Sequence, residues 1–338
     1  MSNPIHSTSA KSVLPMLAMR GLATGLCAGC VVGLLRLSHD RAAARVALWL
    51  EEWREVWWTV PIWFGVLVAL AVILRRIVRE EPLISGSGIP QTELALAGRL
   101  SFTWWRVLLA KFLGSWLALF GGLALGREGP SIQMGGAVGA GFHALWRPAA
   151  PHALTGSPYV VAGAVAGLAA AFGAPAAGVL FAFEEMKSRR DTSLIVAACA
   201  SAIGAHLMIR IVFGMGRILP FAGFEAPPLS SFWIVALEGA VFGVLGVGYN
   251  KTLLWLHDRE AGQTLIPDRW RALPPLLLAG CLALFAPLLI GGGESLIIFV
   301  GEHDVALKTL ILLLAFKYLF AQYSTVASIP GGLLMPIL

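Results

Sequence analysis

The sequence predicts an all-α polytopic membrane protein, and three observations support this class. Hydrophobic residues make up 57% of the 338 residues and charged residues only 13%, and the mean hydropathy is +0.77, a composition foreign to water-soluble domains. Uncharged runs recur at lengths near the roughly 20 residues with which a helix crosses a bilayer. No stretch sustains the strand-like alternation, over about 10 residues between turns, that a membrane β-barrel requires.

The predicted spans follow one another along the chain in two unequal sets. The first span is expected near residues 14–37, followed by uncharged runs at 56–74, 148–183, 192–209 and 272–293. The run 148–183 is too long for one simple span, and we expect Gly173-Ala174-Pro175 to divide it. A second set of spans is expected to start at about Ser231, after a polar break near residues 224–228.

This pattern predicts three parts. Residues 1–13 are expected to form a mobile cytoplasmic N-terminal tail, because they are polar and lack the features of a signal peptide. Residues 14–224 are expected to form a first membrane repeat and residues 225–338 a partial second one. Weak symmetry of this kind is typical of transporters built from inverted repeats, whose interrupted helices meet near the middle of the membrane.

The net charge of +6 is better explained by membrane topology than by nucleic-acid binding. The basic residues lie beside apolar segments and are not massed on an arm or on one helix face. Arginines or lysines follow two of the spans, so both boundaries are expected to be cytoplasmic and the linker 51–54 external. These residues are Arg75, Arg76, Arg79, Lys187, Arg189 and Arg190. The predicted partner is a lipid bilayer, and no nucleic acid is expected.

Three glycine-proline motifs interrupt the apolar pattern. The first motif reads Gly-Ser-Gly-Ile-Pro at residues 86–90, the second Gly-Arg-Glu-Gly-Pro at 126–130, and the third Pro-Gly-Gly-Leu-Leu-Met-Pro at 330–336. In each, flexible glycines precede a proline suited to the first turn of a helix. Arg127 and Glu128 follow the uncharged run 112–126, and charge at such a place is expensive and therefore expected to be functional.

Broken helices with these motifs predict an anion site. A helix N-terminus leaves backbone N–H groups unpaired and carries about half a positive charge, so it holds an anion without a full cation that would bind it too tightly for transport. Ser87 adds a hydroxyl donor, and Leu333 and Leu334 offer backbone amides. None of these segments supplies the clustered carboxylates or carbonyls of a cation site, so neither a metal nor a cofactor is predicted.

Through these motifs, the chain resembles the CLC family of chloride channels and chloride/proton exchangers. The three motifs occur in the family's order and approximate spacing. Residues 178–186, Gly-Val-Leu-Phe-Ala-Phe-Glu-Glu-Met, resemble the segment that carries the family's inner glutamate pair. The resemblance extends from about residue 14 and implies the CLC-type inverted repeat of tilted and broken helices, with an incomplete second repeat.

The resemblance also implies roles for single residues. Ser87 resembles the serine that coordinates the central anion and is associated with chloride preference. Glu128 resembles the gating glutamate, which occupies the outer anion site when charged and swings away when protonated, and Glu185 resembles the inner glutamate that relays protons from the cytoplasm. The implied anion-binding set is Ser87, Gly88, Ile89, Arg127, Gly129, Leu333 and Leu334. The expected function is therefore chloride/proton antiport, without enzymatic activity, by a homodimeric multi-pass protein of the cell inner membrane.

Two departures from the family pattern matter. Residues 332–336 read Gly-Leu-Leu-Met-Pro, where the family usually has a phenylalanine; because the ligands there are backbone amides, we expect the site to persist with an altered apolar gate. The family core also continues beyond Leu338. The tyrosine that completes the central site is expected in that further part, since neither Tyr318 nor Tyr323 matches its position.

Plainer roles remain open for the same residues. Glu128 could form a structural ion pair with Arg127 or Lys111. Ser87 could serve only as a helix N-cap. Glu185 could belong to a salt-bridged face at the membrane interface. The alternative functions are a passive chloride channel of the same fold, a non-transporting truncated product and a membrane-embedded enzyme. The last has little support, because the chain contains no H-E-x-x-H or G-x-S-x-G motif.

Overall fold

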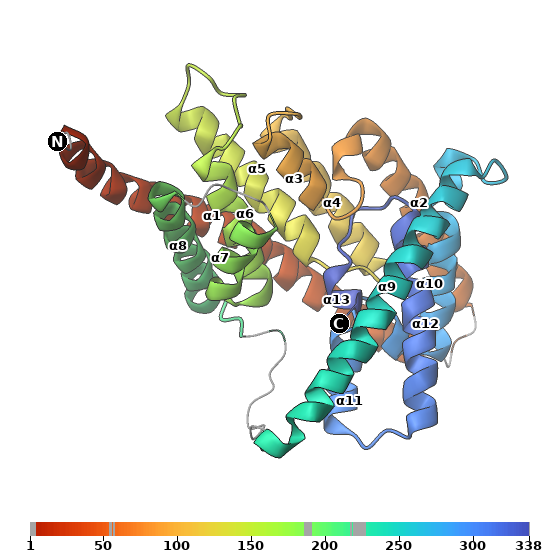
Figure 1. Ribbon diagram of the computed structural model, residues 1–338. Helices are drawn as coiled ribbons and strands as arrows, with labels where there is room; N and C mark the ends of the chain where they lie inside the picture. Colours follow the sequence, from red (N-terminus) through yellow and green to blue (C-terminus); the bar gives the residue numbers. More distant parts are fainter. Residues whose placement is uncertain are drawn as a thin grey trace.

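The computed structural model describes residues 5–53, 56, 58–185, 191–216, 218 and 228–337, and the regular structure in these ranges is helical. Two isolated β-bridges are its strand-like pairings. Figure 1 shows the helices as one bundle with α1 running along much of its length. The first helices are α1 Ile5–Trp53, α2 Thr59–Glu80, α3 Ile89–Leu96, α4 Trp104–Phe120, α5 Glu128–Trp146, α6 Pro158–Phe172 and α7 Pro175–Glu184. The others are α8 Thr192–Leu207, α9 Phe232–Gly262, α10 Leu273–Phe285, α11 Glu294–Glu302, α12 Leu307–Val326 and α13 Leu334–Ile337.

The predicted polytopic class is confirmed. Within the described ranges, five helical segments are long and apolar enough to cross a membrane: Val13–Val46, Thr59–Glu80, Thr192–Val212, Leu229–Gly262 and Leu307–Val326. The predicted division of 148–183 is also confirmed. Helix α6 ends at Phe172, Gly173 takes a left-handed conformation with φ 67°, and Pro175 begins α7, because glycine adopts this conformation easily and proline suits a first helical turn.

The chain differs from expectation before the first span. Helix α1 already begins at Ile5 and continues to Trp53, so residues 5–13 of the expected tail are helical and continuous with the span. Between Ile5 and Pro15 the chain has neither glycine nor proline to end a helix. Residues 1–4, the basic residues Lys187, Arg189 and Arg190, and the boundary at residues 224–225 lie outside the described residues.

Two large apolar clusters and a small one, of Val78, Ile84 and Val107, form the core of the described residues. The larger is built from α1, α5, α6 and α8, and the other from α2, α4, α10 and α12. Helices α5 and α6 pack so closely that a Cβ atom added to Gly163 would overlap the carbonyl oxygen of Gly135. Such small-residue contacts let helix backbones approach in the membrane. The larger cluster contains Ile132 and packs against Ile89 of the first motif, and the other contains Leu125 and Ile329, which directly precede the second and third motifs.

The two halves repeat one pattern. Lys111 precedes Gly126 and Lys317 precedes Gly332 by the same number of residues. Upstream of each lysine lies a helix, α3 or α11, that begins after a left-handed glycine, Gly88 with φ 88° or Gly293 with φ 107°. The segment around Gly291 to Gly293 is therefore the second-half counterpart of the first motif, and the third motif is the counterpart of the second.

Candidate anion and proton site

The second and third motifs join through a reciprocal pair of backbone hydrogen bonds. The Gly126 N–H donates to the Gly332 carbonyl at 2.7 Å, and the Gly332 N–H donates to the Gly126 carbonyl at 2.7 Å. Equivalent residues that exchange equivalent bonds lie about a two-fold axis. The pseudo-symmetry axis of the two repeats therefore passes near this pair.

The first motif joins the third beside that pair. The Gly86 N–H donates to the Ile329 carbonyl at 3.2 Å, and the Gly331 N–H donates to the Gly86 carbonyl at 3.0 Å. A Cβ atom at Gly129 would lie 2.8 Å from the Cβ of Ser87, so the first motif also contacts the second. All three motifs thus meet in one place, although they are far apart in the sequence.

Ser87 is half-buried at this junction. Its Oγ accepts a long hydrogen bond of 3.3 Å from the Ile89 N–H, which is the local bond of a serine before a helix. Because the Ser87 oxygen is the acceptor in this bond, its hydroxyl hydrogen is free to donate to an anion. The N-cap of α3 is Gly88, without a side-chain cap bond, so Ser87 precedes the cap, and anion binding by its hydroxyl stays a prediction.

Glu128 is the first residue of α5 and is fully buried, with 0% of its surface exposed. No side chain in the described part of the chain hydrogen-bonds its carboxylate, and the polar groups that stabilise it are the backbone N–H groups of Glu128 itself and of Met335 in α13. Its Oε2 lies against Gly126, and the Cβ of Met335 borders the same glycine. A buried carboxylate is costly unless hydrogen bonds compensate it, and here the starts of two helices supply that contact.

The guanidinium of Arg127 is engaged away from Glu128. One nitrogen is 3.0 Å from Asp40 Oδ1 on α1, and another is 2.9 Å from Glu294 Oε1 at the start of α11. The Arg127 side chain is only 5% exposed. The structure therefore does not contain the Arg127–Glu128 ion pair that the sequence left open, and anion binding by Arg127 stays a prediction for its backbone amide.

Two buried lysines hold the loops of the first motif and of its counterpart. The Lys111 Nζ donates to the carbonyls of Ile84 at 2.8 Å and Gly86 at 2.7 Å, not to Glu128. The Lys317 Nζ donates to the carbonyls of Leu289 at 3.0 Å and Gly291 at 2.6 Å. Both ammonium groups thus fix a glycine loop by its carbonyls, at equivalent places in the two halves.

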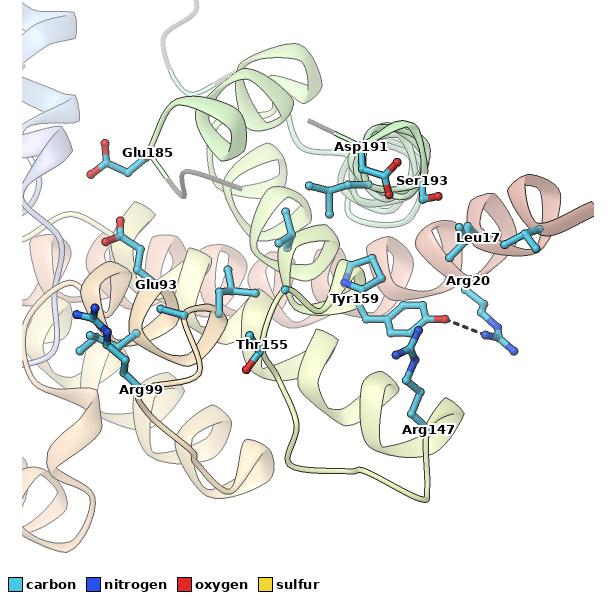
Figure 2. A pocket seen from close by; sticks show the side chains of 18 of the residues that line it. Leu17, Arg20, Glu93, Arg99, Arg147, Thr155, Tyr159, Glu185, Asp191 and Ser193 are labelled. Atoms are coloured by element: carbon cyan, nitrogen blue, oxygen red, sulfur yellow. Dashed lines mark hydrogen bonds between the residues drawn. The ribbon is translucent and has the colours of Figure 1, made fainter. Parts of the chain in front are cut away.

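Glu185 lies apart from the motif junction, exposed at the end of α7. It lines a cavity of about 1290 Å³, and Figure 2 shows it at the same end of that cavity as Glu93. Another cavity, of about 440 Å³, borders Gly126, Arg127 and Glu294. Glu128 therefore lies next to residues that line one cavity, while Glu185 lines a different one.

The remaining predicted ligands belong to the same junction. Gly88 and Gly129 are buried, and Ile89 is half-buried. Leu333 is half-buried, while the Leu334 side chain is 44% exposed. The first amides of a helix lack intrahelical partners, so anion binding at these positions stays a prediction about backbone N–H groups.

Sequence reasoning missed four residues near these sites: Asp40, Glu93, Glu294 and Lys317. The equal spacing of Lys111 and Lys317 from their glycines was a usable signal for the lysine. The three acids gave no local signal, because their neighbours at the sites come from distant segments. Among the described residues, no group of three or more His, Cys, Asp or Glu is placed to hold a metal ion.

Comparison with known proteins identifies the family of this architecture. The family model described as voltage gated chloride channel matches residues 64–338. The H(+)/Cl(-) exchange transporter ClcA of Vibrio cholerae is 34% identical over 324 residues, which cover 93% of this chain and 69% of the relative. The ClcA transporter of Vibrio campbellii is 34% identical over 321 residues, covering 92% of this chain and 68% of that protein.

Solved structures agree with these relatives. The crystal structure of a slow cyanobacterial Cl⁻/H⁺ antiporter superposes with a TM-score of 0.86 at 28% identity, covering 95% of this chain and 76% of that one. A CLC-type fluoride/proton antiporter shares the fold, with a TM-score of 0.69 at 17% identity. This chain belongs to the voltage-gated chloride channel family, the CLC family.

Proposed function

We propose that this protein exchanges chloride for protons across the cell inner membrane. The observation that carries the proposal is Glu128, a fully buried carboxylate that lies against backbone N–H groups of α5 and α13 at the junction of three interrupted segments. Its position suits a side chain that moves and changes its protonation state.

The chemistry of the junction explains how one carboxylate couples two ions. A charged Glu128 and a chloride ion compete for the same backbone N–H groups and helix dipoles. Protonation removes that competition, so the site accepts chloride when the carboxyl group carries a proton. Each exchange of carboxylate for chloride therefore moves a proton in step with an anion.

Glu185 supplies the second half of the proton route in this proposal. Its carboxylate is exposed and lines a large cavity, so protons reach it directly from water. The basic residues of the alternative salt-bridged face, Lys187, Arg189 and Arg190, lie outside the described residues. Names of the relatives, H(+)/Cl(-) exchange transporter and Cl⁻/H⁺ antiporter, support exchange over a passive channel.

The assembly and location are part of the same proposal. We expect a homodimer with one pathway in each subunit, embedded as a multi-pass protein. Large apolar side chains such as Phe242 on α9 and Leu312 on α12 are exposed, so these faces suit lipid or a second apolar surface. Cross-linking in native membranes measures the subunit number directly.

The test reconstitutes the full-length protein in chloride-loaded liposomes and records external chloride and pH together. An outward chloride gradient should drive protons inward against their own gradient. Glu128→Gln should still move chloride but no longer move protons, and Glu185→Gln should give the same separation of the two fluxes. The matched control is Glu238→Gln, an exposed carboxylate on α9, which should transport as the native protein does.

Each other outcome argues against a defined part of the proposal. Uphill proton movement by Glu128→Gln would exclude Glu128 as the coupling residue. Chloride flux without proton flux in the native protein would make it a passive channel of the same fold. An effect of Glu238→Gln equal to that of Glu128→Gln would show that any lost membrane carboxylate disturbs transport.

A further inference from the structure

The cavity that contains Glu185 has a second, basic end. It is lined there by Arg20 of α1, Arg147 after α5, Tyr159 of α6, and Asp191 and Ser193 at the start of α8. Figure 2 shows Arg20 and Arg147 at the same end as Tyr159, with Glu93 and Glu185 at the opposite end. The two arginines outnumber the one acid at this end, so it favours a negatively charged group.

The basic end is a built site and not a loose surface patch. Tyr159 is only 2% exposed, and its hydroxyl accepts a 2.8 Å hydrogen bond from the Arg20 guanidinium. That guanidinium also lies over the Trp146 ring, 5.1 Å from its centre, and Trp146 packs edge-on against Tyr159 with the ring centres 4.9 Å apart. Arg20 is therefore held in place before any ligand arrives.

Several donors converge there without acceptors of their own. Arg147 has no ion pair within the described ranges, and the hydroxyl hydrogen of Tyr159 remains available because Arg20 is the donor in their bond. Ser193 adds a further hydroxyl. Two guanidinium groups with neutral donors match the oxygen-rich, doubly bridging geometry of a phosphate group.

The surroundings indicate that the phosphate belongs to a lipid. Val13, Met16 and Leu17 line the same cavity, and Val13 begins the first apolar span while remaining 37% exposed. Apolar side chains therefore lie beside guanidinium groups at the end of a span, where the headgroup layer of a bilayer lies. An excess of arginine at this end marks the cytoplasmic side.

We propose that this cavity binds the phosphate ester of an anionic cytoplasmic-leaflet phospholipid, with the phosphate between Arg20 and Arg147 and the acyl chains along α1. The bound lipid occupies the end of the cavity opposite Glu185, and its binding does not depend on the proposed antiport function.

Binding is measured by native mass spectrometry of the full-length protein in detergent, titrated with phosphatidylglycerol or with phosphatidylcholine. The native protein should retain phosphatidylglycerol preferentially. Arg147→Gln should weaken that retention about tenfold, the loss expected for one charge-assisted contact. Arg147 is exposed, so its replacement leaves the fold intact. The matched control is Arg79→Gln, which replaces an exposed arginine in the last turn of α2.

The outcomes separate the possible ligands. Equal retention of the two lipids by the native protein, or unchanged retention by Arg147→Gln, overturns the site. Binding of soluble glycerol 3-phosphate as tightly as the lipid, with the same loss in Arg147→Gln, keeps the phosphate site but overturns the lipid as its source.

Discussion

Replacing both acids that hold Arg127 should destabilise the protein far more than replacing either one. The perturbation is a double-mutant cycle of Asp40→Asn and Glu294→Gln. The Arg127 side chain is 5% exposed, whereas those of Asp40 and Glu294 are 51% and 31% exposed. A buried cation is thus neutralised by two carboxylates that reach solvent.

The magnitudes follow from these exposures. Asp40→Asn removes a half-exposed charge and should cost about 0.2–1 kcal/mol. Glu294→Gln keeps a hydrogen-bond acceptor but loses the charge, and should cost about 1 kcal/mol. The double variant removes both carboxylates that form ion pairs with the buried guanidinium, which should cost about 3–5 kcal/mol. The two changes should therefore be coupled by about 1–3 kcal/mol.

Thermal unfolding in detergent, followed by tryptophan fluorescence, measures the cycle. The control cycle is Arg76→Gln with Glu80→Gln, an i,i+4 pair whose side chains are 75% and 63% exposed, where the effects should be small and additive. Additive effects at Asp40 and Glu294 as well would refute the view that Arg127 needs a counter-charge. The double variant should also lose chloride/proton exchange, because Arg127 directly precedes Glu128.

Two further predictions concern the lysines and the small residues. Lys111→Met removes the charged donor that two backbone carbonyls share and should lower the free energy of unfolding by about 1–3 kcal/mol. It should also weaken chloride binding, measured by titration calorimetry, more than Lys317→Met does. The reason is that only Lys111 holds the loop that carries the predicted serine ligand. If both variants bind chloride equally, that loop does not carry the site. Gly163→Ala should destabilise by about 1–3 kcal/mol, because its methyl group overlaps the backbone of α5, whereas Gly65→Ala, where nothing lies within 4 Å of the added atom, should be tolerated in the same melting assay. Equal melting temperatures would contradict the close approach of α5 and α6.

The sequence predicted those features of the fold that neighbouring residues determine. The break between α6 and α7 was readable because Gly173 and Pro175 act within one turn, and the spans were readable from their lack of charge. The start of α1 could not be predicted in this way, because polar residues alone do not end a helix. Helix ends need a glycine, a proline or a cap, and the segment before Pro15 contains neither glycine nor proline.

The partners of the charged residues could not be predicted in the same way. Arg127 bonds to Asp40, 87 residues away, and to Glu294, 167 residues away, so its nearest neighbour in sequence, Glu128, was the wrong candidate for an ion pair. The three motifs indicated the site, but the reciprocal contact between Gly126 and Gly332 depends on the symmetry of the whole chain. That symmetry was present in the spacing of Lys111 and Lys317.

The reciprocal bonds between Gly126 and Gly332 also bear on the order in which the protein matures. Gly126 emerges from the ribosome well before Gly332, and contacts between such distant segments form after local ones. The α1–α5–α6–α8 cluster has all of its residues in place before the third motif is made. The ion site is therefore completed only after this first cluster can pack, so a newly inserted chain has a packed first half before it has a pathway for ions.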